Sequence, residues 1–230
     1  MDTLSLFVIF AITFFCIAVI HIGIPYVLRN AIAKSVLRQR VRNDKIYLTF
    51  DDGPDPTSTP LILDTLKKNG VKATFFVIGE ALENTPDILR RIHDEGHSIG
   101  SHSQIHTHAW RTLPWTSYGD IRKGMASLEK RGIESNLWRP PYGKASLQTL
   151  AYTLFKKKDL VYWTADPQDY DPSQTISTLR DWLNKHAGLG SVILLHDGRR
   201  HQEDGENITP AALADFLHHT DIPSTQFAAL

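Results

Sequence analysis

The sequence has almost no cysteine and no net charge, and each lack excludes a class of protein. Its 230 residues include one cysteine, Cys16, so the chain cannot form a disulfide within itself. The 25 lysines and arginines balance 25 acidic residues, so no overall attraction to nucleic acid is expected. Internal repeats and low-complexity segments are also missing, and nothing indicates a protein partner. At 42% hydrophobic residues, the chain can bury one sizeable core.

Charge is also missing from one long stretch. Leu4 to Leu28 reads LSLFVIFAITFFCIAVIHIGIPYVL, without an acid, lysine or arginine. It exceeds the roughly 20 residues with which a helix crosses a bilayer core. A cleaved signal peptide is the alternative, with Ala31-Ile32-Ala33 as an imitation of a cleavage site. The leading Met-Asp lacks positive charge, however, and the run is longer than the usual roughly 7–15 residues. We predict a single-pass transmembrane anchor over residues 1–28.

A basic segment follows the anchor. Arg29, Lys34, Arg38, Arg40 and Arg42 outnumber the acids of residues 29–44. We predict a basic juxtamembrane linker over these residues, either solvated or lying as an amphipathic helix on anionic lipid. The positive-inside tendency would hold the domain that follows in the cytoplasm. The side of the membrane stays open at this point.

From residue 45 onward, short apolar runs alternate with helical patterns. Strands are predicted over 45–50, 73–79, 97–103, 136–138, 159–165 and 191–197, and helices over 60–69, 86–95, 118–130, 147–158 and 175–185. Thr59 is the expected N-cap of the first of these helices. Strands that alternate with helices indicate a parallel α/β sheet or barrel. Residues 45–230 are therefore predicted to form one α/β domain.

Polar motifs follow five of the predicted strands. In chain order they read DDG, SHSQIHTH, RPPYG, DPQDYD and HDG. In parallel α/β folds, the C-terminal ends of the strands meet at one rim, where chemistry collects. Five polar strand ends would therefore converge there, and this convergence predicts a functional site.

The first two motifs predict a metal centre. His102 and His106 are spaced i, i+4 and can present two imidazoles to one ion, and one of Asp51 and Asp52 would complete a three-ligand set. Imidazole and carboxylate suit a borderline divalent ion such as zinc. The second carboxylate could then take a proton from water. The alternatives are an Asp-Gly turn with a capping aspartate, and a surface histidine pair.

In their order and spacing, TFDDGP, HSQIH, RPPYG, DPQDY and LLHD resemble the five motifs of the NodB-type polysaccharide deacetylases, carbohydrate esterase family 4. The resemblance covers about Lys45 to Ile208. It implies a distorted, incomplete (β/α) barrel that removes acetyl, or another small acyl group, from amino sugars of a polysaccharide or lipid-linked glycan. It also implies one divalent cation, with zinc first and cobalt, nickel or manganese as alternatives.

The resemblance also implies roles for the reacting residues. Asp51 would be the general base, paired with Arg139, which tunes it. His196 would be the general acid that protonates the leaving amine. Either Asp169 or Asp166 would orient His196, with Asp169 preferred, because the spacing admits both.

The remaining roles concern the metal and the pocket. Asp52 would join His102 and His106 as the third metal ligand. The backbone N–H of Tyr142 would help to hold the oxyanion, and Leu194 would line the pocket for the acetyl methyl group. Tyr170 stands where the family usually has tryptophan, which leaves the shape of the pocket wall open.

Other functions compete with this interpretation. A deformylase or deacetylase of a lipid-linked sugar would act at the cytoplasmic face. A non-catalytic carbohydrate-binding protein could use the same fold, and a glycosyltransferase could hold a nucleotide-sugar's metal with its acidic cluster. Trp110 and Trp115 could stack on sugar rings or anchor their loop by packing. The expected partners are an N-acetylated glycan or glycolipid and, through the N-terminal helix, membrane lipid.

Overall fold

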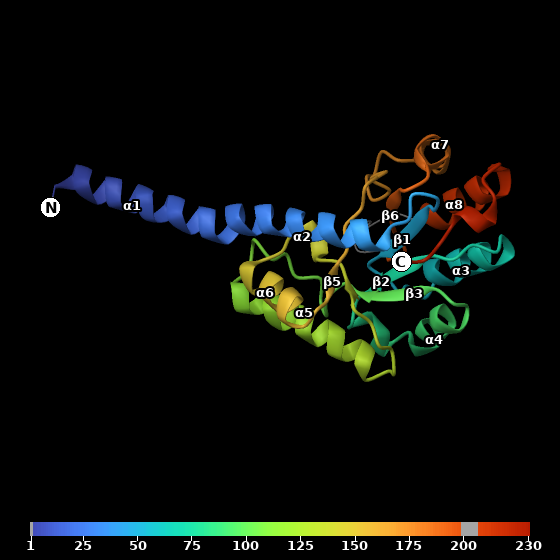
Figure 1. Ribbon diagram of the computed structural model, residues 1–230, viewed down its shortest axis with the longest axis horizontal. Helices are drawn as coiled ribbons and strands as arrows, with labels where there is room; N and C mark the ends of the chain where they lie inside the picture. The colour runs from blue at the N-terminus through green and yellow to red at the C-terminus, as the bar shows by residue number, and fades with distance from the viewer. Residues whose placement is uncertain (1, 199–206) are drawn as a thin grey trace.

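A parallel sheet forms the centre of the domain (Figure 1). The computed structural model describes residues 2–198 and 207–230. Within these residues the sheet has six strands in the order β5-β4-β3-β2-β1-β6, every pair parallel. The strands are β1 (Tyr47–Asp51), β2 (Thr74–Val77), β3 (Ser98–Ser101), β4 (Leu137–Trp138), β5 (Asp159–Leu160) and β6 (Val192–His196). The predicted α/β class and incomplete barrel are confirmed.

The segment that was predicted as one strand over 159–165 is divided between the two edges of the sheet. Its first two residues pair with β4, whereas Ala165 forms an isolated bridge to Ile193 on β6. The chain therefore bends between these pairings and links the edge strands β5 and β6. This bend curls the sheet into a distorted half-barrel.

Helices cover the outer face of the sheet (Figure 1). They are α3 (Ser58–Lys68), α4 (Pro86–Asp94), α5 (Pro114–Glu129), α6 (Leu147–Phe155), α7 (Ile176–His186) and α8 (Thr209–His219). The last of these was not predicted. Its signal was present, because Pro210 suits a first helical turn and Leu213, Phe216 and Leu217 recur at helical spacing.

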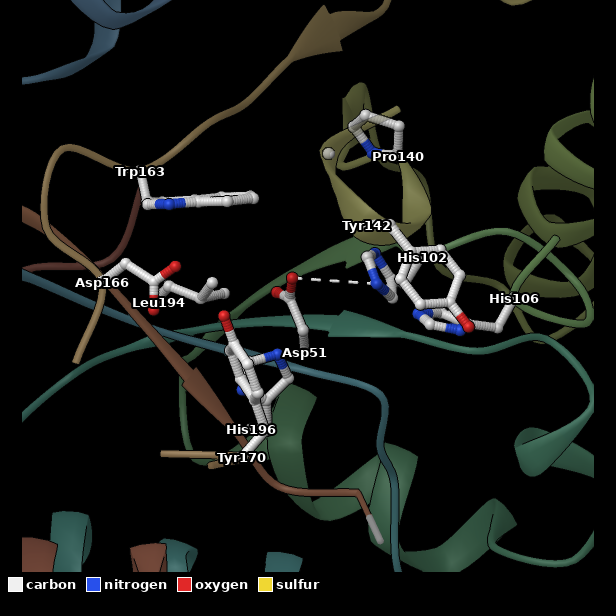
Figure 2. A pocket seen from close by; sticks show the side chains of 11 residues that line it. Asp51, His102, His106, Pro140, Tyr142, Trp163, Asp166, Tyr170, Leu194 and His196 are labelled. Atoms are coloured by element: carbon white, nitrogen blue, oxygen red, sulfur yellow. Dashed lines mark ion pairs between the residues drawn. The ribbon is translucent and has the colours of Figure 1, made fainter. Parts of the chain in front are cut away.

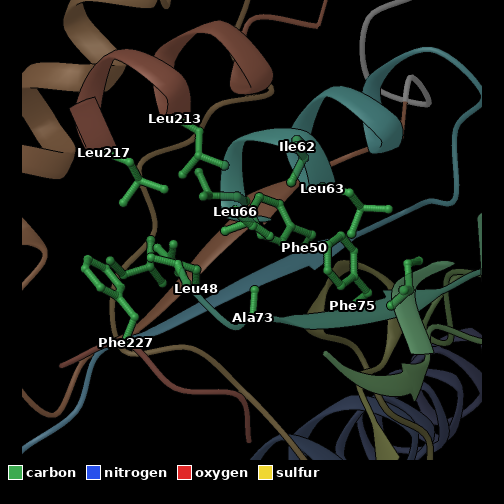
Figure 3. Packing of buried hydrophobic residues seen from close by; sticks show 14 of the residues in the cluster. Leu48, Phe50, Ile62, Leu63, Leu66, Ala73, Phe75, Leu213, Leu217 and Phe227 are labelled. Carbon is green, nitrogen blue, oxygen red and sulfur yellow. The ribbon is translucent and has the colours of Figure 1, made fainter. Parts of the chain in front are cut away.

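The main core lies between β1, β2 and the helices α3 and α8 (Figure 3). Along β1 the side chains alternate, as strand geometry requires. Leu48 and Phe50 belong to this core, and the Phe50 ring stacks on Phe75 with centroids 5.0 Å apart. Thr49 and Asp51 contact a buried arginine of the barrel interior instead. One strand therefore supplies both the core and the site.

The prediction that Thr59 caps α3 is wrong. The helix begins at Ser58, and the carboxylate of Asp55 accepts the backbone N–H groups of Thr57 and Ser58. The buried Thr59 hydroxyl instead donates to Asp197 at 2.6 Å. Its sequence position suited a cap, but its partner directly follows β6, far along the chain.

The N-terminal segment forms a continuous helix over Thr3–Arg40, apolar and long enough to cross a membrane by length and composition. It comprises α1 (Thr3–Ala18), a π turn (Val19–Gly23) and α2 (Ile24–Arg40). Residues 3–17 are exposed. The residues predicted as a linker, 29–44, are helical as far as Arg40, and Arg29, Ala33 and Val36 are buried against the domain. Neither sequence alternative, solvated linker or helix on lipid, includes this packing.

Candidate active site and metal centre

The polar strand ends meet around one pocket of about 260 Å³ (Figure 2). It opens at the C-terminal ends of the strands, where the sequence placed the site. All five polar motifs contribute to its wall. The lining residues are Asp51, His102, His106, Pro140, Tyr142, Gly143, Trp163, Asp166, Tyr170, Leu194 and His196.

Asp52, His102 and His106 form a buried cluster suited to a metal ion. Their ligand atoms all lie within 4.8 Å of one another. Asp52 Oδ1 is 3.0 Å from His106 Nε2 and 3.3 Å from His102 Nε2. His102 Nδ1 lies 2.8 Å from the carbonyl oxygen of Arg139, which it can reach as a donor. That bond turns the lone pair of Nε2 toward Asp52, as a metal ligand requires.

Electrostatics support the same assignment. Burial lowers the pKa of His102, but the carboxylates of Asp51 and Asp52 outweigh burial and raise it. The cluster therefore favours an added positive charge, and a divalent cation supplies that charge while accepting both imidazole lone pairs. The donor set, one carboxylate and two imidazoles, fits a site that keeps a coordination position open.

The loops that carry the ligands have strained backbones. Asp52, Ser103 and His106 have φ values of 76°, 71° and 60°, a region that residues other than glycine rarely occupy. Such strain persists only where the surroundings enforce it. Here the carboxylate of Asp120 on α5 does so, because it accepts the N–H groups of residues 104, 105 and 107 at 3.0, 2.8 and 2.9 Å.

Asp197 plays the corresponding part for the Asp52 turn. Its Oδ1 accepts the N–H of Gly53 at 3.1 Å, and its own N–H donates to the carbonyl of Asp51. Burial raises the pKa of Asp197 to about 7. Sequence reasoning missed both Asp120 and Asp197. The only available signal was an acid in an apolar or helical stretch, because their partners are backbone groups of distant loops.

Asp51 lies beside the cluster and is held by Arg139. Arg139 Nη1 is 2.8 Å from Asp51 Oδ1 and donates at the same distance to Thr49 Oγ1. The arginine is fully buried, and its guanidinium carbon lies 4.2 Å from the centre of the Phe76 ring. Asp51 Oδ2 is 3.8 Å from His102 Nε2. This carboxylate is thus fixed at the pocket and borders the metal cluster.

Asp169, rather than Asp166, contacts His196. The distance from Asp169 Oδ1 to His196 Nδ1 is 2.7 Å, and Oδ2 accepts the N–H of His196 and the hydroxyl of Thr209, both at 2.7 Å. Burial lowers the pKa of His196, but Asp169, followed by Asp52 and Asp51, outweighs it and raises the pKa to about 10. Asp166 lines the pocket, and burial raises its pKa.

Aromatic residues and Leu194 form the pocket wall (Figure 2). The Tyr170 ring stands edge-on to His196 with centroids 5.3 Å apart, and the Tyr142 ring lies 4.5 Å from His106. Tyr142 has φ 56°, so the RPPYG turn is also strained. Trp163 lines the pocket as well, although it stands in an apolar run that resembles core.

The N-terminal helix reaches the rim of this pocket. Arg29 on α2 donates from Nη1 to the Tyr162 hydroxyl at 3.2 Å, and that hydroxyl donates to the carbonyl of Gly143 at 2.7 Å. The Arg29 guanidinium also lies near the rings of Tyr26 and Trp110. Trp110 donates from its ring to the carbonyl of Ala145, so it packs the loop, while Trp115 is 66% exposed.

Comparisons with known proteins agree with this geometry. The family profile described as polysaccharide deacetylase matches residues 38–162. A peptidoglycan-N-acetylglucosamine deacetylase of Bacillus cereus is 34% identical over 187 residues, which cover 76% of this chain and 81% of that protein. A peptidoglycan-N-acetylmuramic acid deacetylase of Bacillus subtilis, PdaC, is 36% identical over 74% of this chain but only 36% of its own length.

A solved structure shows the same architecture. The peptidoglycan deacetylase PdaC from Bacillus subtilis superposes with a TM-score of 0.69 at 31% identity. The match covers 82% of this chain and 89% of that one. The two chains therefore share the same overall fold.

Proposed function

The chain belongs to the polysaccharide deacetylase family and is a metal-dependent N-deacetylase of polysaccharides; on that premise we propose that its substrate is peptidoglycan, and that it removes N-acetyl groups from the amino sugars of the glycan strand. Two relatives named for this substrate support the proposal. They differ in the sugar that they deacetylate, so the choice between glucosamine and muramic acid units is left to experiment. The small pocket beside Asp51 and Leu194 suits an acetyl group.

The main support for this reaction is the buried cluster of Asp52, His102 and His106, which lies beside the separate carboxylate of Asp51. These three residues would hold the cation, for which we propose zinc because two imidazoles and one carboxylate suit it. When bound, such an ion polarises the amide carbonyl and lowers the pKa of water to about 7.

The protein's own residues would then move the protons. Asp51, fixed by Arg139, would take a proton from the water that attacks the acetyl carbonyl. The backbone N–H of Tyr142 would hold the negative charge that develops on the carbonyl oxygen. His196, held by Asp169, would give its proton to the amine as the carbon–nitrogen bond breaks. Acetate and a free amino sugar would leave.

The methyl group of the leaving acetate would occupy the wall around Leu194. Tyr170 would shape the same wall, since its ring also lines the pocket and stands edge-on to His196. A larger acyl group would need more space along the same wall. The pocket therefore supports acetyl as the preferred acyl group.

We also propose that the N-terminal helix is a retained membrane anchor with the domain on the outer face, where peptidoglycan lies. Cleavage near Ala31-Ile32-Ala33 would remove Arg29 and expose Val36, both of which pack into the domain. Arg40 of the same segment also has a partner within the domain, Asp159. A reporter enzyme that is active only outside the cytoplasm, fused to the C-terminus, tests on which side of the membrane the domain lies.

Metal removal and two matched substitutions test the reaction. Chelation should abolish amine release from N-acetylated glycan strands, and zinc should restore it. Asp51→Asn should lose activity but keep its metal, whereas Asp52→Asn should lose the metal itself, measured by elemental analysis. Activity that survives chelation, or the opposite pattern in the two variants, would overturn the assignment of ligand and base.

A further inference from the structure

The free part of the N-terminal helix is too short to cross a bilayer by itself. Residues 3–17 are exposed, Ala18 and His21 are partly buried, and Pro25 is the first buried residue of the helix. These 15 residues span about 22 Å at about 1.5 Å per residue. A hydrocarbon core is about 30 Å thick, so roughly five further residues must lie within it. Figure 1 shows α1 extending away from the domain.

The domain lies beside those further residues. A groove of about 370 Å³ is lined on the helix side by Ile17, Ile20 and His21. On the domain side it is lined by Thr112, Leu113, Pro114, Leu147 and Gln148. Any bilayer that covers the helix to about residue 22 therefore also meets this side of the domain.

The side chains there are those expected at a membrane surface. Leu113 is 56% exposed, and Trp115 is 66% exposed. A second groove continues from Trp115 and Tyr118 to Tyr152, Phe155 and Lys156, with Phe155 86% exposed. Tryptophan and tyrosine concentrate where the bilayer meets water, and lysine can extend to the headgroups. We call residues 112–118 with 147–156 the membrane edge.

We propose that the membrane edge is a second membrane-binding surface, seated in the headgroup region of the leaflet from which the helix emerges. The proposal rests on the anchor proposed above. Lipid is favoured over a glycan chain because the surface is continuous with the apolar helix. Leu113, Leu154 and Phe155 also have no side-chain group that could hydrogen-bond to a sugar hydroxyl. The domain would thus sit on the bilayer, at one height, rather than on a flexible tether.

Site-directed spin labelling tests the proposal in the full-length protein. With Cys16→Ala as background, Leu113→Cys and Trp115→Cys would carry the label at the membrane edge. Leu189→Cys is the matched control, since Leu189 is also 56% exposed. It adjoins Gly190, whose neighbours are Asn43 and Lys45, beyond the other end of the helix. The protein is reconstituted in vesicles of phosphatidylcholine and phosphatidylglycerol.

The readout is relaxation of the label by oxygen, which concentrates in lipid, against a water-soluble nickel chelate. The ratio of relaxation by oxygen to relaxation by the chelate should be clearly higher at positions 113 and 115 than at 189. A label on native Cys16 reports separately whether the helix lies in hydrocarbon. If Cys16 is in lipid while 113 and 115 match 189, the membrane edge is refuted and the anchor stands; if Cys16 is also in water, both fail.

Glycan binding is the remaining rival occupant. Soluble chitooligosaccharide added to the detergent-solubilised protein should leave the label at 115 unchanged. Immobilisation by the sugar, without lipid contact in vesicles, would overturn the proposal. Retained deacetylation of soluble substrate shows that the labelled variants fold, because none of these positions lines the catalytic pocket.

Discussion

Replacing Asp169 by asparagine removes the charge that holds His196 protonated. The two side chains meet at 2.7 Å, and the Asp169 side chain is 1% exposed. A hydrogen bond to a charged group contributes about 1.5–3 kcal/mol, and each pKa unit corresponds to about 1.36 kcal/mol. Asp169→Asn should therefore lower the pKa of His196 by about 1–2 units.

The sign of the effect on activity follows from the role proposed for His196. A general acid must carry its proton, so activity is lost as the pH rises through its pKa. In wild type, Asp169 raises that pKa. The basic limb of the profile should consequently move by about 1–2 pH units toward acid in the variant. At the wild-type optimum, kcat should fall on the order of 10²-fold, the lower end for general acid–base catalysis.

The assay is the pH dependence of kcat for amine release from a soluble N-acetylated oligosaccharide. Thr209→Val is the matched control, because it removes one 2.7 Å hydrogen bond to the same carboxylate but leaves its charge. Its basic limb should move much less. If Asp169→Asn keeps the wild-type basic limb while remaining folded, His196 is not the acid or Asp169 does not set its pKa.

Three further substitutions test the supports of the site. Arg139→Met removes the arginine that pairs with the buried Asp51 carboxylate and should destabilise the fold by about 3–5 kcal/mol, measured by urea unfolding. Gly124→Ala places a Cβ 2.4 Å from the carbonyl carbon of Ser103, so it should cost about 1–3 kcal/mol and weaken zinc binding in calorimetry. Arg29→Ala removes the brace on the RPPYG turn and should lower kcat more than it raises KM, whereas an unchanged kcat would deny any coupling of helix and turn.

The sequence predicted the rim of the site because parallel strands place their C-terminal ends together. Each motif could be recognised from the strand that precedes it, as Asp51 and Asp52 could at the end of β1. The choice between Asp166 and Asp169 as the partner of His196 could not be made in the same way. Both follow β5 closely, and the bend after that strand, which brings Ala165 to β6, decides which one reaches the histidine.

Residues that hold loops were beyond sequence reasoning for a different reason. Asp120 accepts three backbone N–H groups, and any residue type can supply a backbone N–H. The pattern of side chains in the sequence therefore does not reveal that Asp120 binds these backbone groups. The aspartate itself stands in an amphipathic helix where an exposed acid would be ordinary, and only its burial distinguishes it.

The basic segment over residues 29–44 shows the same limit, because its partners in the domain cannot be inferred from its own residues. Arginines at 29 and 40 suggest solvent or lipid headgroups, yet their partners, Tyr162 and Asp159, lie more than a hundred residues along the chain. Because Arg29 joins α2 to the RPPYG turn through Tyr162, the helix and the catalytic rim form one packed unit. The helix is therefore attached to the domain by packing and not through a flexible linker. As the membrane anchor proposed above, it would fix the distance between bilayer and pocket, so the enzyme would act on the glycan strands that pass at that height.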